Sequence, residues 1–323
     1  MTAFSGVKTE SLHEVGQNLN RPECVLCTAD GSLYVADWGG GVTRIRPDGS
    51  QDQYLASDAP CPLLPNGIAL QRDGSFLLAN LGDAGGVWQL HRDGSVAPFV
   101  TEMDGQALPP CNFVLIDREG RVWITVSTRI EPRALAYRPD IADGFIIVVD
   151  EAGPRVVASG LGYTNEVHMH PSGDWVYVNE TFAKRLSRFP VTPDGGLGAR
   201  ETVAVIGHGT FPDGLAFDEE GAAWVVSIVS NRVIRVEQNG RQTTVVEDAD
   251  PAHVDWVEAA FASGSMGREH LDQVRSDRLR NLSSIAFGGP DRRTCYLGCL
   301  LGNSLVSFRA PVAGVEPAHW HVT

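Results

Sequence analysis

A tight-turn signal followed by a short hydrophobic run, rich in aromatic or β-branched residues, recurs along the chain. Five copies place an Asp-Gly-like pair before an aromatic or β-branched run: DGSLYVAD (30–37), DGSFLLAN (73–80), EGRVWITV (119–126), SGDWVYVNE (172–180) and EGAAWVVS (220–227). Their turn glycines lie 43 to 53 residues apart, and a sixth copy, PDRRTCYLGC (290–299), follows a longer gap. Because such pairs tolerate the positive φ of a tight turn between twisted strands, each copy predicts a β-hairpin.

Further strand-like segments follow each hairpin. A third run ends in another turn in five copies, as in VTRIRPDG and VIRVEQNG, whereas the last copy has LVSFRAP without the turn. Segments such as QDQYLA, VAPFV, RVVAS and QTTVVE supply a fourth, edge strand. Four antiparallel strands per repeat make one propeller blade, so the sequence predicts an all-β, six-bladed β-propeller spanning one domain, residues 1–323. A pair of β-sandwiches or a β-helix fits this period less well.

Two insertions interrupt the repeat. The first, near 128–143, is expected to be a loop and carries Arg129, Arg133 and Arg138. The second, near 247–281, has spaced apolar residues (Val254, Val257, Ala260 and Phe261) that predict at least one helix, which could cap one face of the ring.

A terminal strand is needed to complete the last blade. Both VKTESLHEV near the start and AHWHVT at the end have strand-like composition. The sequence alone does not decide between them.

Composition and charge limit the classes of partner. With 43% hydrophobic and 20% charged residues among 323, the chain is typical of a globular protein. Its net charge of −14 disfavours nucleic acid and anionic membrane surfaces as partners. The first residues lack the apolar core of a secretory signal, and the apolar runs are strand-sized, so we expect a cytoplasmic protein without membrane spans. The oligomeric state is not predicted.

Six cysteines are too sparse for a disulfide framework in a chain of this length, and we expect free thiols. Cys24 and Cys27 form a Cys-x-x-Cys pair, but strand alternation turns them to opposite faces and no second pair lies at zinc-finger spacing.

One position of the repeat is polar in every copy. Eight residues before the turn lie Glu23, Asn66, Asn112, Asn165, Asp213 and, counted back from Asp291, Ser283. Two residues further on, each copy is apolar. This position begins the innermost strand of each blade, so the six side chains are expected to converge at one mouth of the central channel.

Oxygen donors dominate this polar ring, which favours a divalent cation such as calcium, magnesium or manganese; zinc is less favoured because no His or Cys shares the position. Two carboxylates near one axis repel each other unless a cation or a proton lies between them. Glu23 and Asp213 are therefore predicted metal ligands. For Asn66 and Ser283, hydrogen bonds to the backbone are the preferred interpretation.

The repeats also resemble a known family, the regucalcin/gluconolactonase family of six-bladed propellers. The resemblance lies in RPECVLCTADGSLYVAD, PNGIALQRDGSFLLAN, CNFVLIDREGRVWIT, YTNEVHMHPSGDWVYVNET, FPDGLAFDEEGAAWV and SSIAFGGPDRRTCYLG, and covers essentially the whole chain outside the insertions. It implies one divalent metal ion, with calcium favoured and zinc, magnesium or manganese as alternatives, held by residues that match Glu23, Asn165 and Asp213. It also implies that Asn112 touches substrate or completes the metal site. Where many members have Asn-Asp, this chain has Asn112-Phe113.

The resemblance implies a hydrolase that opens a sugar-lactone-like ester, with Asp213 as the catalytic base. Asn112 could donate a hydrogen bond to the developing oxyanion. Of the three arginines in the first insertion, Arg129 is the first candidate for binding a substrate carboxylate or hydroxyl, with Arg133 or Arg138 next. The alternatives are a calcium-binding or scaffold propeller without catalysis, and a lyase or isomerase that uses the same cation.

Two other glutamates lie near Asn165 in the sequence. Glu166 and Glu180 are candidate acids, and Glu180, at the end of a predicted strand, is expected to be exposed at the surface.

Overall fold

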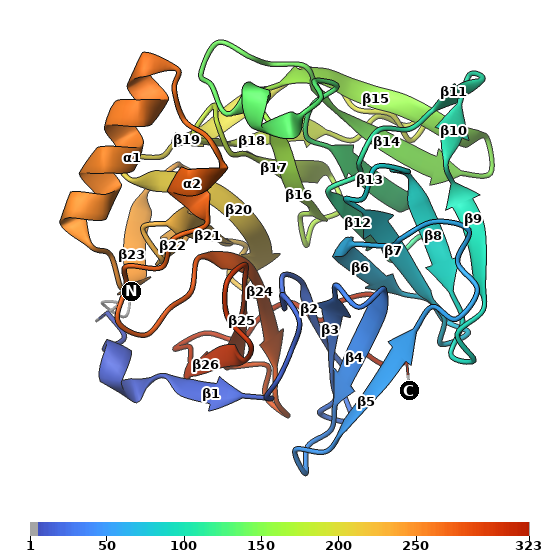
Figure 1. Cartoon of the computed structure of the whole chain (residues 1–323), viewed down its shortest axis with the longest axis horizontal. Helices are drawn as coiled ribbons and strands as arrows, with labels where there is room; N and C mark the ends of the chain where they lie inside the picture. The colour runs from blue at the N-terminus through green and yellow to red at the C-terminus, as the bar shows by residue number, and fades with distance from the viewer. Residues whose placement is uncertain (1–5, 323) are drawn as a thin grey trace.

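Six four-stranded antiparallel sheets surround a common axis in the computed structural model, which describes residues 6–322 (Figure 1). This arrangement is a six-bladed β-propeller and confirms the fold that the repeat predicts. The turn glycines adopt the required backbone, with φ of 82° at Gly31 and 85° at Gly120.

The first three blades follow chain order. The first holds β2 (Val25–Cys27), β3 (Leu33–Asp37), β4 (Gly41–Ile45) and β5 (Gln51–Leu55). The second holds β6 (Pro65–Leu70), β7 (Phe76–Asn80), β8 (Val87–Leu90) and β9 (Val96–Val100). The third holds β12 (Phe113–Ile116), β13 (Val122–Val126), β14 (Gly144–Asp150) and β15 (Gly153–Leu161). A short hairpin of β10 (Glu102–Met103) and β11 (Gln106–Ala107) comes between the second and third blades in sequence.

The other three blades complete the ring. The fourth holds β16 (Thr164–Met169), β17 (Trp175–Glu180), β18 (Arg185–Pro190) and β19 (Glu201–Val205). The fifth holds β20 (Thr210–Phe217), β21 (Ala223–Val229), β22 (Arg232–Val236) and β23 (Gln242–Glu247). The sixth holds β24 (Leu282–Gly288), β25 (Thr294–Cys299), β26 (Leu305–Arg309) and, as its outer strand, β1 (His13–Val15).

The N-terminal segment therefore closes the ring. Strand β1 follows a 3₁₀ turn, η1 (Thr9–Ser11), and pairs antiparallel with β26, placing Glu14 opposite Val306. The C-terminal segment, which the sequence offered as the other candidate, forms a turn at 318–321 instead of a strand. Its Trp320 is buried and accepts a 2.7 Å hydrogen bond from the Ala29 N–H through its backbone oxygen.

Buried aspartates fix large aromatic residues between the blades. The indole Nε1 of Trp123 donates to Asp117 at 2.8 Å, and that of Trp224 donates to Asp218 at 2.9 Å. Each aspartate lies just beyond an innermost strand and is almost fully buried. The same contact in two blades shows how the repeat satisfies an indole N–H inside an apolar core.

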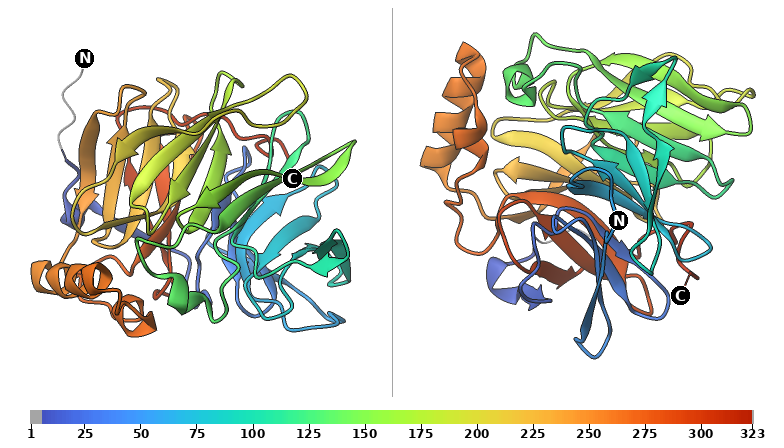
Figure 2. Two further views of the ribbon diagram at one scale, coloured as in Figure 1. Left: turned by 90° about the horizontal axis from the view of Figure 1, so that it is seen from above. Right: turned by 45° about the vertical axis from the view of Figure 1, so that its right-hand side comes forward.

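The two insertions lie on one face of the ring (Figure 2). The second contains α1 (Pro251–Ser263) and α2 (Arg268–Leu271), which confirms the predicted helix; Asp250 caps α1 by accepting a 3.0 Å hydrogen bond from the His253 N–H. The first is a loop with a short 3₁₀ helix, η2 (Arg133–Ala136). Side chains from both insertions share one apolar cluster, in which Tyr137 and Phe261 both lie against Phe182.

Within residues 6–322, no helix combines the length and the apolar character that crossing a bilayer requires. All six cysteines are free, and only Cys61 is not fully buried.

Leu12 anchors the closing segment in the core of the neighbouring blades, because its side chain is 3% exposed in a cluster with Val245 and Leu282. We expect Leu12→Ala to lower the free energy of unfolding by about 2–5 kcal/mol, measured by urea unfolding followed by tryptophan fluorescence. Glu14→Ala, on the exposed side of β1, is the control and should change it by less than about 0.5 kcal/mol. Equal effects of the two substitutions would contradict this anchoring role.

Candidate functional site

The polar position of the repeat lies where the innermost strands begin. The first strands of neighbouring blades contact one another around the axis. All six predicted side chains lie there and are between 1% and 6% exposed: Glu23, Asn66, Asn112, Asn165, Asp213 and Ser283. The sequence thus identified a buried polar ring at the starts of these strands.

A break in the β-ladder occurs at this ring in four blades. The register shifts between Pro65 and Ile68, between Thr164 and Val167, between Pro212 and Leu215, and between Leu282 and Ser284. Each shift spans the polar residue of its blade. Such bulges redirect side chains next to functional sites, because the extra residue no longer pairs across the sheet.

Asn66 and Ser283 bond to the backbone of the next blade, as expected for these two residues. The Asn66 Nδ2 donates to the Asn112 backbone oxygen at 3.0 Å, and the Ser283 Oγ donates to the Glu23 backbone oxygen at 2.9 Å. The Oδ1 atoms of Asn66 and Asn112 are buried and have no hydrogen-bond partner. Two buried acceptors are therefore left for a donor or a cation.

Asp213 lies in a bulge of blade five, and side chains of blade four form hydrogen bonds with this bulge. The Asn179 Nδ2 donates to the backbone oxygens of Asp213 and Gly214 at 2.9 and 3.0 Å, and the Thr181 Oγ1 donates to the Pro212 oxygen at 2.8 Å. The Glu166 carboxylate accepts a 2.7 Å hydrogen bond from the Leu215 N–H. Side chains of one blade thus satisfy the backbone groups that the ladder of the next blade leaves unpaired.

Three carboxylates and one guanidinium set the charge of the site. Burial, followed by the charges of Glu23 and Glu166, raises the pKa of Asp213 well above its usual range, against smaller opposing effects of Arg21 and Asn165. Burial also raises the pKa of Glu166. Arg21 pairs with Glu23 at 3.0 Å and stacks on Trp38, with its guanidinium carbon 4.1 Å from the ring centroid. With all three carboxylates ionised, one cation is outnumbered three to one.

The chemistry of this ring fits a divalent cation that prefers oxygen. Its donors are carboxylate and amide oxygens, two amide oxygens lack partners, and the carboxylates repel one another. Glu23, Asn165 and Asp213 can supply such ligands from three blades. In the part of the chain that the structure describes, no three His, Cys, Asp or Glu side chains have metal-binding geometry, so amides would have to complete the coordination.

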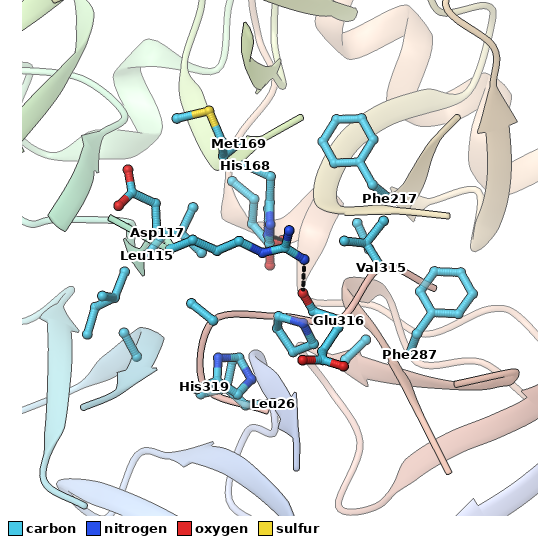
Figure 3. Close-up of a pocket in the computed structure, with 18 of the residues that line it drawn as sticks. Leu26, Leu115, Asp117, His168, Met169, Phe217, Phe287, Val315, Glu316 and His319 are labelled. Atoms are coloured by element: carbon cyan, nitrogen blue, oxygen red, sulfur yellow. Dashed lines mark hydrogen bonds and ion pairs between the residues drawn. The ribbon is translucent and has the colours of Figure 1, made fainter. Parts of the chain in front are cut away.

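The opposite end of the channel is different in character. A cavity of about 260 Å³ lies there, among apolar side chains such as Leu26, Leu115, Met169, Phe217 and Phe287 (Figure 3). The C-terminal segment 315–319 lines it, and the Arg118 guanidinium donates to the Glu316 backbone oxygen at 2.9 Å. Burial lowers the pKa of His319 to about 4, which keeps its imidazole neutral. The cavity extends along the inner strands as far as Cys24 and Glu166, and Asp117, Glu119 and Glu316 also line it, so apolar side chains and carboxylates share this end of the channel.

The structure corrects the expectation for Glu180, which is fully buried. Its carboxylate pairs with the Arg185 guanidinium at 2.7 Å, and it accepts hydrogen bonds from the Ser187 hydroxyl and the Gly162 N–H. Glu180 and Arg185 lie opposite each other in the β17–β18 ladder. The sequence feature that could have indicated a buried ion pair is Arg185, which follows Glu180 by five residues on the other strand of the hairpin.

The arginines of the first insertion occupy different environments. Arg129 is exposed, and its guanidinium carbon lies 3.8 Å from the Phe145 ring centroid. Arg138 is exposed and pairs with Asp140 at 2.7 Å. Arg133 is half-buried, and its Nη2 donates to the Ser127 hydroxyl at 3.1 Å. Sequence reasoning ranked Arg129 first because it could not tell which arginine is enclosed.

Asp213 makes the metal-free protein sensitive to pH. A carboxyl group whose folded-state pKa is raised favours folding in its protonated form, fully below the ordinary pKa of 3.8, and this contribution is lost as the pH rises through the folded-state pKa. The groups facing it are Glu23, Glu166, Arg21 and Asn165. In EDTA at pH 7, we expect Asp213→Asn to raise the free energy of unfolding by about 0.5–2 kcal/mol.

Urea unfolding between pH 4 and pH 8 measures this difference, which should shrink toward acid pH as the wild-type carboxyl becomes neutral. Glu119→Gln, at an exposed carboxylate on the opposite end of blade three, should show no such trend. A wild-type protein as stable as the Asp213→Asn variant at pH 8 would contradict the unfavourable burial of this charge.

Comparison with known proteins identifies relatives of this chain. It is 27% identical to a 6-deoxy-6-sulfogluconolactonase of Pseudomonas putida over 272 residues, which cover 82% of this chain and 78% of the relative. A gluconolactonase from Xanthomonas campestris has a similar fold, with a TM-score of 0.68 and 19% identity over 93% of this chain and 89% of the other. A calcium-binding regucalcin from Agrobacterium tumefaciens aligns with a TM-score of 0.64 and 16% identity, covering 94% and 92% of the two chains.

Residues 21–254 also match the family described as the SMP-30/Gluconolactonase/LRE-like region. The match begins two residues before Glu23 and includes five of the six positions of the polar ring, ending within α1. The chain belongs to the SMP-30/gluconolactonase/LRE-like family.

Proposed function

We propose that this protein is a metal-dependent hydrolase that opens a sugar-lactone-like cyclic ester at the polar ring. The observation that carries the proposal is the buried set of carboxylates with two unpartnered amide oxygens at the starts of the inner strands. Membership of a family that includes gluconolactonases, and a relative named for a sulfogluconolactone, support this substrate class.

Glu23, Asn165 and Asp213 are the proposed metal ligands. Calcium is the preferred ion because the donors are hard oxygens and a fold relative is described as calcium-binding; zinc, magnesium and manganese are alternatives. When bound, the ion would supply Lewis acidity toward the lactone carbonyl and lower the pKa of water. Its charge would also offset the repulsion between the carboxylates of Glu23 and Asp213.

Asp213 is the proposed general base. In the metal-free protein, burial and then the charges of Glu23 and Glu166 raise the pKa of this carboxyl, which makes its carboxylate a better proton acceptor than an exposed one. The blade-four contacts from Asn179 and Thr181 hold its backbone, so the carboxylate has a fixed position from which to take a proton from water. Asn112 is the proposed contact to the substrate carbonyl region, where its Nδ2 would donate a hydrogen bond to the developing oxyanion.

Metal removal gives the first test. We expect the purified protein to release acid from glucono-1,5-lactone, to lose this activity after EDTA treatment and dialysis, and to regain it on addition of calcium or another divalent cation. The rate is followed with a pH indicator and corrected for spontaneous opening. Full activity in the stripped protein would contradict metal dependence, whereas tight calcium binding with no turnover of any aldonolactone would favour a non-catalytic binding role.

Asp213→Asn tests the catalytic assignment. We expect it to reduce kcat by at least about a hundredfold, because it removes both the base and a ligand charge. Thermal melting should show that the fold is retained. Glu119→Gln, which also removes one carboxylate, serves as the matched control and should retain activity within about twofold. Unchanged kinetics in Asp213→Asn would exclude Asp213 as the base.

A further inference from the structure

Arg133 is a half-buried arginine that pairs with no carboxylate among residues 6–322. Its Nε is buried without a hydrogen-bond partner, and only its Nη2 has one in the described part of the chain, the Ser127 hydroxyl. The guanidinium carbon lies 5.5 Å from the centroid of the Tyr163 ring. A guanidinium offers five N–H donors, so most of its capacity remains for another group.

Arg133 lies near the starts of the inner strands of blades three and four, which carry Asn112 and Asn165. Ser127, which accepts from Arg133, follows β13, whose Thr125 pairs with Phe113 and accepts a 2.8 Å hydrogen bond from the Asn112 N–H. Tyr163 comes two residues before Asn165. The charge of Arg133 acts on both Cys111 and Tyr163, lowering the pKa of each against the larger effect of burial. Arg133 therefore lies beside the polar ring, between blades three and four.

The charge around the site shows why a guanidinium such as that of Arg133 would matter for an anionic substrate. The whole chain carries a net charge of −14, so its overall field is negative even when a divalent cation offsets the carboxylates of the ring. A neutral lactone needs no compensation there, but a lactone with an acidic substituent would be repelled. A planar guanidinium with free donors binds carboxylate or sulfonate oxygens in a paired geometry.

We propose that Arg133, supported by Ser127 and Tyr163, is a subsite for an anionic substituent, so that the substrate is a lactone bearing a carboxylate or sulfonate away from the ester. This inference rests on the proposed function and narrows its substrate class. Arg133 is then a specificity-determining residue that contacts the substituent and takes no part in opening the ring.

The test compares two lactones that differ only in charge: glucono-1,5-lactone and the analogue with a sulfonate in place of the 6-hydroxyl. We expect the wild-type protein to have the higher kcat/KM on the sulfonate. Arg133→Gln should lose on the order of ten- to a hundredfold in kcat/KM on the sulfonate, mainly through KM, and less than about threefold on the neutral lactone. The kcat/KM of Arg133→Lys on the sulfonate should lie between those of the wild type and Arg133→Gln, because lysine keeps the positive charge but lacks the paired N–H donors of the guanidinium.

Two controls separate the possible failures. Arg241→Gln removes the same charge from an exposed arginine paired with Glu237, and should leave both substrates unaffected within about twofold. Thermal melting establishes that the Arg133 variants fold. Equal losses on both lactones, or no loss on either, would overturn the subsite while leaving lactone hydrolysis intact.

If the wild-type protein opens neither lactone, the proposed function fails, and the subsite is still tested by binding. Calorimetric titration of calcium-loaded protein with 6-deoxy-6-sulfogluconate and with gluconate should then show tighter binding of the sulfonate, and this preference should disappear in Arg133→Gln. Equal affinities in the wild type, or a preference that survives the substitution, would overturn the subsite as well.

Discussion

The site depends on the bulge at the start of β20 and on the hydrogen bonds that blade four gives it. A strand that broke its ladder inside the core would normally carry unsatisfied backbone groups, which cost free energy. Here the Pro212, Asp213 and Gly214 carbonyls accept from Asn179 or Thr181, and the Leu215 N–H donates to Glu166. These hydrogen bonds satisfy four backbone groups of the irregular segment, and the buried Asp213 carboxylate lies close to Glu23, Glu166 and Asn165.

The same arrangement places the carboxylates of Glu166 and Asp213 close together in the protein interior, where burying a charge costs free energy. Glu166 holds the bulge through its carboxylate, yet that carboxylate raises the pKa of Asp213. The group that supports the bulge therefore also increases the affinity of the Asp213 carboxylate for a proton. One side chain thus contributes both to the local structure and to the unfavourable burial of charge.

Much of the fold and part of the site could be predicted from the sequence. The turn glycines fixed the blade count, and the position eight residues before each turn located the buried polar ring. Residues outside that register could not be found this way. Asn179 and Thr181 act through contacts between blades, which a repeat within each blade does not encode. The burial of Glu180 depends on Arg185, which lies across a hairpin and is not part of the repeat pattern. The enclosure of Arg133 likewise depends on how an insertion folds back, which its composition does not determine.

Closure by the N-terminal strand has a consequence for biosynthesis. His13 pairs with Ser307, which lies far along the chain, so β1 must wait for β26 to be synthesised before it can hydrogen-bond. Until the two strands pair, β1 has no sheet to join, and β26, once made, is an open edge that can pair with other chains. Contacts between the two ends of a long chain also form slowly, because closing a large loop costs entropy. The ring is thus sealed after synthesis, and the unsealed interval is the stage at which this protein is most exposed to misassembly.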